Sequence, residues 1–308
     1  MSARPRLAAV LPLLAACSLA PTDSDPWPDT SAPLAETVGW LDERPVTYGA
    51  VARYLRTKDP EAFSRALEGL VLERVTRAEA APLEVKVRPA LVTRETDRRM
   101  RDWERRVRAA AKEEGGQEIE PALWLQRVAG ISVAQLRSWV RDHTEIELLQ
   151  DRLLRYESLT SPQVEVSILV LKDEAQLRRF RAVAERDGSF PALARKHSLH
   201  ASAKDGGRVG YPLLPADIND PAVRDQLFQA EPGRILGPFP TRGGAETFFQ
   251  LYLVERVRPA RQGDYALMAR EVERDLEARP VPVGEYERWR RRILLRHGFV
   301  AAHAAGES

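Results

Sequence analysis

The sequence predicts an α+β protein in which helical segments precede and follow a central region that contains strands. Three observations support this prediction. The apolar, largely β-branched run 164–171 is typical of a buried strand. Residues 36–160 follow helical spacing for most of their length, and apolar stripes within 263–298 have the period of amphipathic helices.

The first residues have the composition of an export signal. Arg4 and Arg6 precede an apolar run, 7–16, that is too short for a comfortable membrane span. The small residues before Cys17 resemble the end of a bacterial lipoprotein signal. This resemblance implies that residues 1–17 are a signal peptide with its lipobox, and that Cys17 is lipidated. An ordinary signal peptide, with a cysteine here by chance, is the alternative.

Residues 18–35 are predicted to be a flexible tether, because they are rich in Pro, Asp, Ser and Thr. Ser18 follows the cysteine where the lipoprotein sorting rule reserves aspartate for retention, which favours the outer membrane if the source is diderm. No later segment is apolar enough to span a bilayer. We therefore expect an exported protein anchored by lipid in the cell envelope, facing the periplasm.

Residues 36–160 are predicted to form a mostly helical domain. A short hairpin over 37–47 leads into a helix at Tyr48. Asp59 and Pro60 start the next helix, because proline is favoured at the first helical position.

A long charged helix is expected over 94–114, and Ser132 with Gln135 forms a capping box for a helix that reaches about Tyr156. The hairpin and the motif over 67–75 are loosely similar to the opening of SurA-type and PrsA-type export chaperones. That similarity implies a chaperone domain whose last helix ends just before the next domain.

Residues 163–259 are predicted to form a second domain that begins with the strand 164–171 and ends with a strand over 247–257. Between them, Asp173 caps a helix that Gly188 ends, since aspartate accepts first-turn amides and glycine tolerates a left-handed turn.

The centre of this region carries the most specific motifs of the chain. The segment 190–198 reads FPALARKHS, and the glycine corner, defined as residues 202–210, reads SAKDGGRVG. In this order with the flanking strands and helices, they resemble a parvulin-type (PpiC-like) peptidyl-prolyl cis-trans isomerase. The resemblance implies a four-stranded antiparallel sheet with surrounding helices. It also implies an enzyme that binds the twisted X-Pro amide better than either planar form.

The parvulin family places two histidines on neighbouring strands, behind a cysteine or aspartate, and an apolar cup for the proline ring. The resemblance assigns the histidine positions to Ser167 and Gln250 and the third polar position to His200, which are the candidate catalytic residues. It assigns the cup, as candidate substrate-binding residues, to Val209, Ile218 and Phe228. The alternatives are that Ser167 and Gln250 line a groove that only binds, and that Val209 and Phe228 are plain core.

Composition excludes several other classes of function. The net charge is only +2, and basic residues alternate with acids as on solvated helix faces, which argues against nucleic-acid binding. His197 and His200 are three residues apart but lack a third ligand, so neither a metal nor another cofactor is predicted. Cys17 is the only cysteine, which excludes an internal disulfide.

A C-terminal helix within 263–298 is expected to pack on the N-terminal domain, because its apolar stripes need a partner. A free basic helix, indicated by the arginines in 288–292, is the alternative. The sequence as a whole predicts a chaperone that binds unfolded, proline-containing exported polypeptides and accelerates X-Pro isomerisation, which takes tens of seconds uncatalysed. Two rival hypotheses are a catalytically inactive peptide-binding module and a docking subunit of an envelope assembly.

Overall fold

The described part of the protein, in a computed structural model, covers residues 37–41, 44–115, 120–243 and 246–299. The expected signal peptide, the lipidated Cys17 and the tether 18–35 lie outside these residues. The chain divides into two compact units, with the boundary between Arg65 and Ala66. Among the described helices, none combines the length and apolar character that crossing a bilayer requires.

The first unit contains the predicted hairpin and the helix after it. Its elements are β1 (Thr37–Leu41), β2 (Arg44–Thr47), α1 (Tyr48–Lys58) and the start of α2 (Pro60–Ala80). The two strands pair antiparallel. The Thr47 hydroxyl accepts a hydrogen bond from the Ala50 amide at 3.2 Å, which fixes the start of α1 at Tyr48 as predicted.

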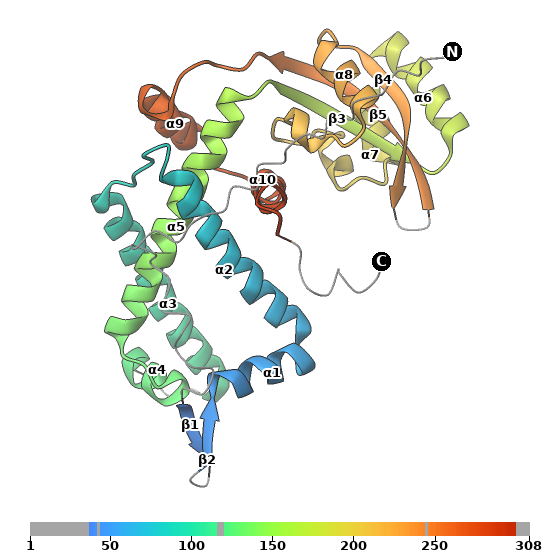
Figure 1. Cartoon of the computed structure of the whole chain (residues 1–308). Helices are drawn as coiled ribbons and strands as arrows, with labels where there is room; N and C mark the ends of the chain where they lie inside the picture. Colours follow the sequence, from blue (N-terminus) through green and yellow to red (C-terminus); the bar gives the residue numbers. More distant parts are fainter. Residues whose placement is uncertain (1–36, 42–43, 116–119, 244–245, 300–308) are drawn as a thin grey trace, which may run out of the picture. The chain divides into compact units, whose positions relative to one another are not determined.

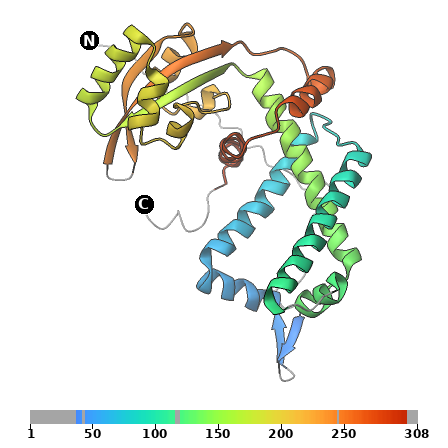
Figure 2. The same ribbon diagram turned by 180° about the vertical axis from the view of Figure 1, so that it is seen from behind.

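Long helices make up the next part of the chain. They are α3 (Pro89–Gly115), α4 (Pro121–Ala129) and α5 (Val133–Thr160). The capping box of Ser132 and Gln135 is present, with the Ser132 hydroxyl accepting from the Gln135 amide at 3.2 Å. Helix α3 begins five residues earlier than predicted because Pro89 acts as its first residue rather than as a break. Helices α3 and α5 run side by side (Figure 2).

The C-terminal helices, α9 (Tyr265–Ala278) and α10 (Val283–Arg296), share one hydrophobic core with α2 and α5. Trp289 is the largest side chain of this core and is only 1% exposed. Its neighbours in the cluster include Ile293 from α10, Val272 from α9 and Leu154 from α5. The apolar stripes of the C-terminal helices are therefore buried. The helical part of the second unit is built from two stretches of sequence separated by about a hundred residues.

Two arginines of α5 are buried beside this core and pair with α9. Arg152 Nε lies 2.7 Å from Glu273 Oε1, and Arg155 Nη1 lies 2.8 Å from Asp275 Oδ2. Both arginine side chains are at most 2% exposed. Burial of a charge is unfavourable unless it is paired, so α9 must pack on α5 in a way that keeps these contacts.

Two arginines of α10 also pair with acidic residues. Arg290 pairs with Glu68 at 2.6 Å, and Arg292 pairs with Asp217. The second contact joins α10 to the strand-containing region. The interpretation of α10 as a free basic helix is therefore wrong, because its apolar stripe is buried and Arg290 and Arg292 have acidic partners far away in the sequence.

The sheet of the second unit has three strands in the order β3 (Gln163–Leu171), β5 (Glu246–Arg258), β4 (Ile235–Gly243), all antiparallel (Figure 1). The expected fourth strand is absent from the described residues. Its place beside β3 is taken by the segment 207–213, which makes only the two isolated bridges Val164↔Leu213 and Ser167↔Arg208. Glycines and Pro212 in that segment prevent a continuous ladder. The α+β class itself is confirmed.

Two helices cover one face of the sheet, α6 (Glu174–Asp187) and α7 (Phe190–His197), and they share a core with Leu169 and Leu251. The other face packs against α8 (Pro221–Gln229) and the loop that follows the glycine corner, which includes the short 3-10 helix η2 (Pro215–Asp217). Another 3-10 helix, η1 (Ala201–Asp205), overlaps the start of the corner. The caps predicted at Asp173 and Gly188 both bound α6.

Candidate functional site

The three residues predicted to form the proline cup come together on one face of the sheet. Val209, Ile218 and Phe228 are all half-buried and pack against the same apolar cluster. They come from the glycine corner, from the end of η2 and from α8, respectively. Half-buried aromatic side chains from β4 and β5 pack on the same cluster: Phe239, Phe248 and Tyr252. The three residues thus contribute to one half-buried apolar surface, and that they bind a proline ring stays a prediction.

The glycine corner is pressed against β3. The Gly207 carbonyl accepts a hydrogen bond from the Ile168 amide at 2.7 Å, and the Val209 amide donates to the Val166 carbonyl at 3.2 Å. Gly207 has φ of +89°, and a Cβ there would lie 2.6 Å from the Ile168 carbonyl oxygen. Only glycine fits both this backbone conformation and this close approach. The glycine corner therefore holds Val209 at a fixed position beside β3, where its side chain forms part of the cup.

His200 lies at the start of η1 and is held by its own turn. Its Nδ1 accepts from the Ser202 amide at 3.2 Å and lies 2.8 Å from the Ser202 hydroxyl. Burial, and then the positive charge of Arg288, lowers the pKa of His200 below its ordinary value. The imidazole is therefore neutral at neutral pH. Because Nδ1 accepts the backbone amide, the ring proton is on Nε2, which makes Nε2 a hydrogen-bond donor.

Ser167 and Gln250 are not brought together. In the ladder between β3 and β5, Ser167 is opposite Leu253 and Gln250 is opposite Val170, with no bulge between these pairs. Residues opposite each other share a face, and faces alternate along a strand. The side chains of Ser167 and Gln250 therefore point to opposite faces of the sheet. Ser167 is 2% exposed and donates a hydrogen bond to Glu255 Oε1 at 2.7 Å.

The polar group that does lie on the cup face with Gln250 is Tyr252. Its hydroxyl donates a hydrogen bond to Gln250 Oε1, and its ring lies 6.1 Å from that of Phe239. Burial raises the pKa of the phenol, which therefore stays protonated at neutral pH. Tyr252 lies directly opposite Ile168. The two facing positions on the cup side are thus one apolar residue and one tyrosine, where the resemblance led us to expect Ser167 and Gln250.

Sequence reasoning missed Tyr252, although a signal was present. Phe248, Gln250, Tyr252 and Val254 alternate along β5 and form one face of a strand. Among the described residues, no group of three His, Cys, Asp or Glu side chains is placed to hold a metal ion. The ring of His197 instead packs on Phe180, with 4.7 Å between centroids.

A comparison with protein-family models matches part of this chain. Residues 172–248 match the model described as "Rotamase: PPIC-type PPIASE domain". The chain carries a PPIC-type peptidyl-prolyl isomerase domain. The match confirms the resemblance expected from the segment 190–198 and the glycine corner, both of which it contains. It stops within β5, before Gln250 and Tyr252, so those two positions lie beyond the matched residues.

Comparison with solved structures gives distant likenesses. PrsA from Bacillus anthracis is 13% identical and has a TM-score of 0.35, and the match covers 77% of this chain and 99% of that one. PrsA from Bacillus subtilis is 15% identical with a TM-score of 0.30, covering 88% and 96%. A SurA-like chaperone from Campylobacter jejuni is 14% identical with a TM-score of 0.30, covering 85% and 96%. Scores and identities this low do not assign function. A search of curated proteins gave no match.

The chemistry available to the PPIC-type domain follows from these groups. Isomerisation requires no nucleophile, only a surface that stabilises an amide rotated out of its plane, against a barrier of about 18–20 kcal/mol. The apolar cup can hold the proline ring away from water. The Tyr252 and Gln250 pair supplies a neutral hydrogen-bond donor and acceptor on the cup face. Ser167, on the other face, is not in a position to contact the same amide.

Proposed function

We propose that this protein is an exported peptidyl-prolyl cis-trans isomerase and folding chaperone that acts on unfolded envelope or secreted polypeptides. The observation that carries the proposal is the half-buried apolar cup of Val209, Ile218 and Phe228 inside a PPIC-type domain. The cup excludes water from one side of a bound X-Pro amide. A twisted amide has less conjugation than a planar one, so a dry, shaped site favours it.

The decisive experiment measures X-Pro exchange by NMR in a short panel of proline peptides, with a soluble form of the protein that begins at Ser31. Acceleration proportional to protein concentration supports the isomerase. Binding without acceleration supports the rival function, a holding chaperone. One observation favours this rival: Ile168, which faces Tyr252 across the cup side of the sheet, has no polar side-chain atom.

Replacing Phe228 by alanine should reduce the exchange rate by about 30-fold or more, because the cup loses apolar contact worth about 2 kcal/mol with the proline ring. Far-UV circular dichroism should show that the domain stays folded, since Phe228 is only half-buried. Leu267→Ala is the matched control, because Leu267 lies in α9 and is 78% exposed. An unchanged rate in the Phe228 variant would remove this residue from the cup.

Replacing Tyr252 by phenylalanine should reduce the exchange rate about tenfold while peptide affinity stays the same. The variant keeps the ring but loses the hydroxyl that donates to Gln250. A hydrogen bond used only in the transition state changes the rate without changing binding, and tenfold corresponds to about 1.4 kcal/mol. Tyr54→Phe, on an exposed face of α1, is the control. Equal loss of affinity and rate would mean that the hydroxyl only shapes the groove.

We further propose that the mature chain is anchored by lipid at Cys17 and faces the periplasm. The basic start, short apolar run and small residues before Cys17 support this. Mass spectrometry of the membrane fraction should find an acylated N-terminal peptide that begins at Cys17, and Cys17→Ser should abolish it. Recovery of an unmodified chain from the membrane fraction would oppose the proposal.

A further inference from the structure

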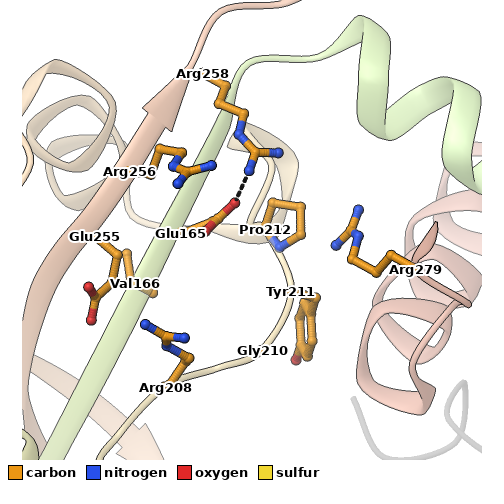
Figure 3. A pocket seen from close by; sticks show the side chains of 10 residues that line it. All are labelled: Glu165, Val166, Arg208, Gly210, Tyr211, Pro212, Glu255, Arg256, Arg258 and Arg279. Carbon is orange, nitrogen blue, oxygen red and sulfur yellow. Dashed lines mark ion pairs between the residues drawn. The ribbon is translucent and has the colours of Figure 1, made fainter. Parts of the chain in front are cut away.

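Two of the three cup residues are the ends of one loop. This cup loop, residues 209–218, begins with Val209 and ends with Ile218, and both side chains pack on the apolar cluster of the cup. Its first residues lie beside β3 (Figure 3). The loop also contacts α10, which belongs to the helical core. Through this loop, the cup is connected to a helix outside the residues that match the PPIC-type domain.

Arg292 of α10 makes an ion pair with the cup loop. Its partner is Asp217, whose other carboxylate oxygen accepts a hydrogen bond from the Leu214 amide at 2.9 Å. The Asp217 side chain is 3% exposed, and that of Arg292 is 11% exposed. A carboxylate removed from water needs both partners, because an unpaired buried charge is strongly unfavourable. Asp217 directly precedes Ile218, so the ion pair fixes the backbone next to a cup residue.

Arg288, one turn earlier in α10, makes a second contact with the same loop. Its Nε donates a hydrogen bond to the Tyr211 hydroxyl at 3.1 Å, and its guanidinium carbon lies 5.8 Å from the centre of the Tyr211 ring. Tyr211 comes two residues after Val209 and packs on the same apolar cluster. A Cβ at Gly284 would lie 2.6 Å from the Tyr211 ring, so α10 approaches the ring as closely as glycine allows. Residues four apart share one face of a helix, so Arg288 and Arg292 reach the loop together.

The contact between α10 and the cup loop is closely packed. A cavity of about 10 Å³ remains between the loop, α5 and α10, which is too small for more than one water molecule. Arg292 also lies 3.4 Å from Glu157 of α5, so its guanidinium group is held by the helical core as well as by the loop. Moving the loop away from α10 would break a buried ion pair and open a void, and both changes are unfavourable.

We propose that Arg288 and Arg292 are positioning residues of the isomerase site, which hold the cup loop on α10 so that Val209 and Ile218 stay in the cup. Both arginines act through the loop rather than on the peptide. The proposal rests on the proposed isomerase function. A binding surface that is fixed before the peptide arrives loses less free energy to ordering. The helical core therefore sets the affinity of the cup for a proline-containing segment.

The test uses the full-length protein, with isoleucine and valine methyl groups labelled for NMR, and a fluorescent proline peptide. Arg292→Gln should shift the methyl signals of Ile218 and weaken peptide binding about fivefold to tenfold, because a displaced Ile218 loses contact with the proline ring. Arg292→Lys keeps the charge and should recover part of the affinity. Combining Arg292→Gln with Asp217→Asn removes the unpaired carboxylate and should restore the affinity to within about twofold of the unaltered protein.

Arg290→Gln is the matched control, because Arg290 is on the same helix but pairs with Glu68 of α2 at 2.6 Å. Its variant should keep both the Ile218 signals and the peptide affinity. Equal losses of affinity in the Arg290 and Arg292 variants would mean that any loosening of α10 has the same effect, and would overturn the proposal. Unchanged Ile218 signals with unchanged affinity in Arg292→Gln would also overturn it.

Arg288→Met is a second variant that decides the matter if circular dichroism shows that Arg292→Gln does not fold. Arg288 is half-buried, and methionine keeps an apolar stem but loses the hydrogen bond to Tyr211. The Val209 methyl signals should shift and peptide binding should weaken about threefold. Unmoved Val209 signals with full affinity would refute the positioning role.

Rates of X-Pro exchange separate this proposal from the proposed function. Methyl shifts and weaker binding in the variants, with no acceleration by the unaltered protein, would support the positioning role while refuting the isomerase. Acceleration that is equal in the unaltered protein and in Arg292→Gln would support the isomerase while refuting the positioning role.

Discussion

Gly207→Ala is expected to destabilise the PPIC-type domain by about 4 kcal/mol and to abolish acceleration of X-Pro exchange. An alanine Cβ would lie 2.6 Å from the Ile168 carbonyl oxygen, at a backbone φ of +89° that side chains avoid. Relieving the clash moves the glycine corner away from β3 and breaks the hydrogen bond from the Ile168 amide. Val209 is two residues after Gly207, so it should move away with the corner, and the cup would lose one of its three side chains.

Gly210→Ala is the control that separates the clash from the backbone strain. Gly210 has nearly the same φ, +86°, but a Cβ there would meet no atom within 4 Å. We expect this variant to lose only about 1–2 kcal/mol and to keep most of its activity. Urea unfolding and NMR exchange, measured on both variants, give the comparison. Equal losses in the two variants would show that close packing of the corner on β3 is not what positions the cup.

Arg155→Ala should destabilise the helical core by about 3–5 kcal/mol, because Asp275 and Glu285 lose their buried partner and keep only Arg279 among the described residues, at 3.6 and 3.7 Å. The Arg155 side chain is fully buried, 2.8 Å from Asp275 and 3.6 Å from Glu285, and it donates to the Arg279 carbonyl at 3.0 Å. Burial already raises the pKa of Glu285 to about 6, and the positive charge of Arg155 opposes that rise. Without Arg155, Glu285 should take up a proton near neutral pH.

Arg141→Ala provides the reference, since Arg141 is an exposed arginine of the same helix, α5. Removing it should change the free energy of unfolding by less than about 0.5 kcal/mol. Urea-induced unfolding followed by circular dichroism at neutral pH measures both variants. A cost for Arg155→Ala close to that of Arg141→Ala would mean that the ion pairs barely repay the desolvation of their charges.

The sequence predicted the secondary structure well wherever the signal was local. Asp173 and Ser132 cap their helices through hydrogen bonds to residues three positions away, so the first residue of each helix could be predicted from a few neighbouring residues. Pro89 shows the limit of such reading. Proline both ends helices and starts them, and the sequence alone did not decide between the two at that position.

The polar half of the candidate site was harder to predict, because successive residues of a strand point to opposite faces of the sheet. An error of one residue in the expected strand register places a side chain on the wrong face of the sheet. Such an error explains why Ser167 and Gln250 were expected to lie together although they point to opposite faces. The apolar cup was less sensitive, since Ile218 and Phe228 come from loops and helices rather than from the ladder. Apolar residues also pack together over a range of registers.

The sequence patterns did not predict the buried charged residues. Arg152 and Arg155 are typical of a solvated helix face when α5 is read alone. Their partners Glu273 and Asp275 are about 120 residues away in the sequence, in α9. Only the three-dimensional arrangement brings the two segments together and turns arginines of ordinary appearance into part of the core.

The chain enters and leaves the strand-containing region at nearly the same point, since the Arg261 amide donates a hydrogen bond to the Leu159 carbonyl at 3.0 Å. The region between them is thus a cassette with adjoining ends. Such a cassette can be excised or exchanged with little strain, because the helices on either side stay within reach of each other. Exchange of this region would therefore leave α5 and α9 joined, and would break the ion pair between Arg292 and Asp217 that ties the region to α10.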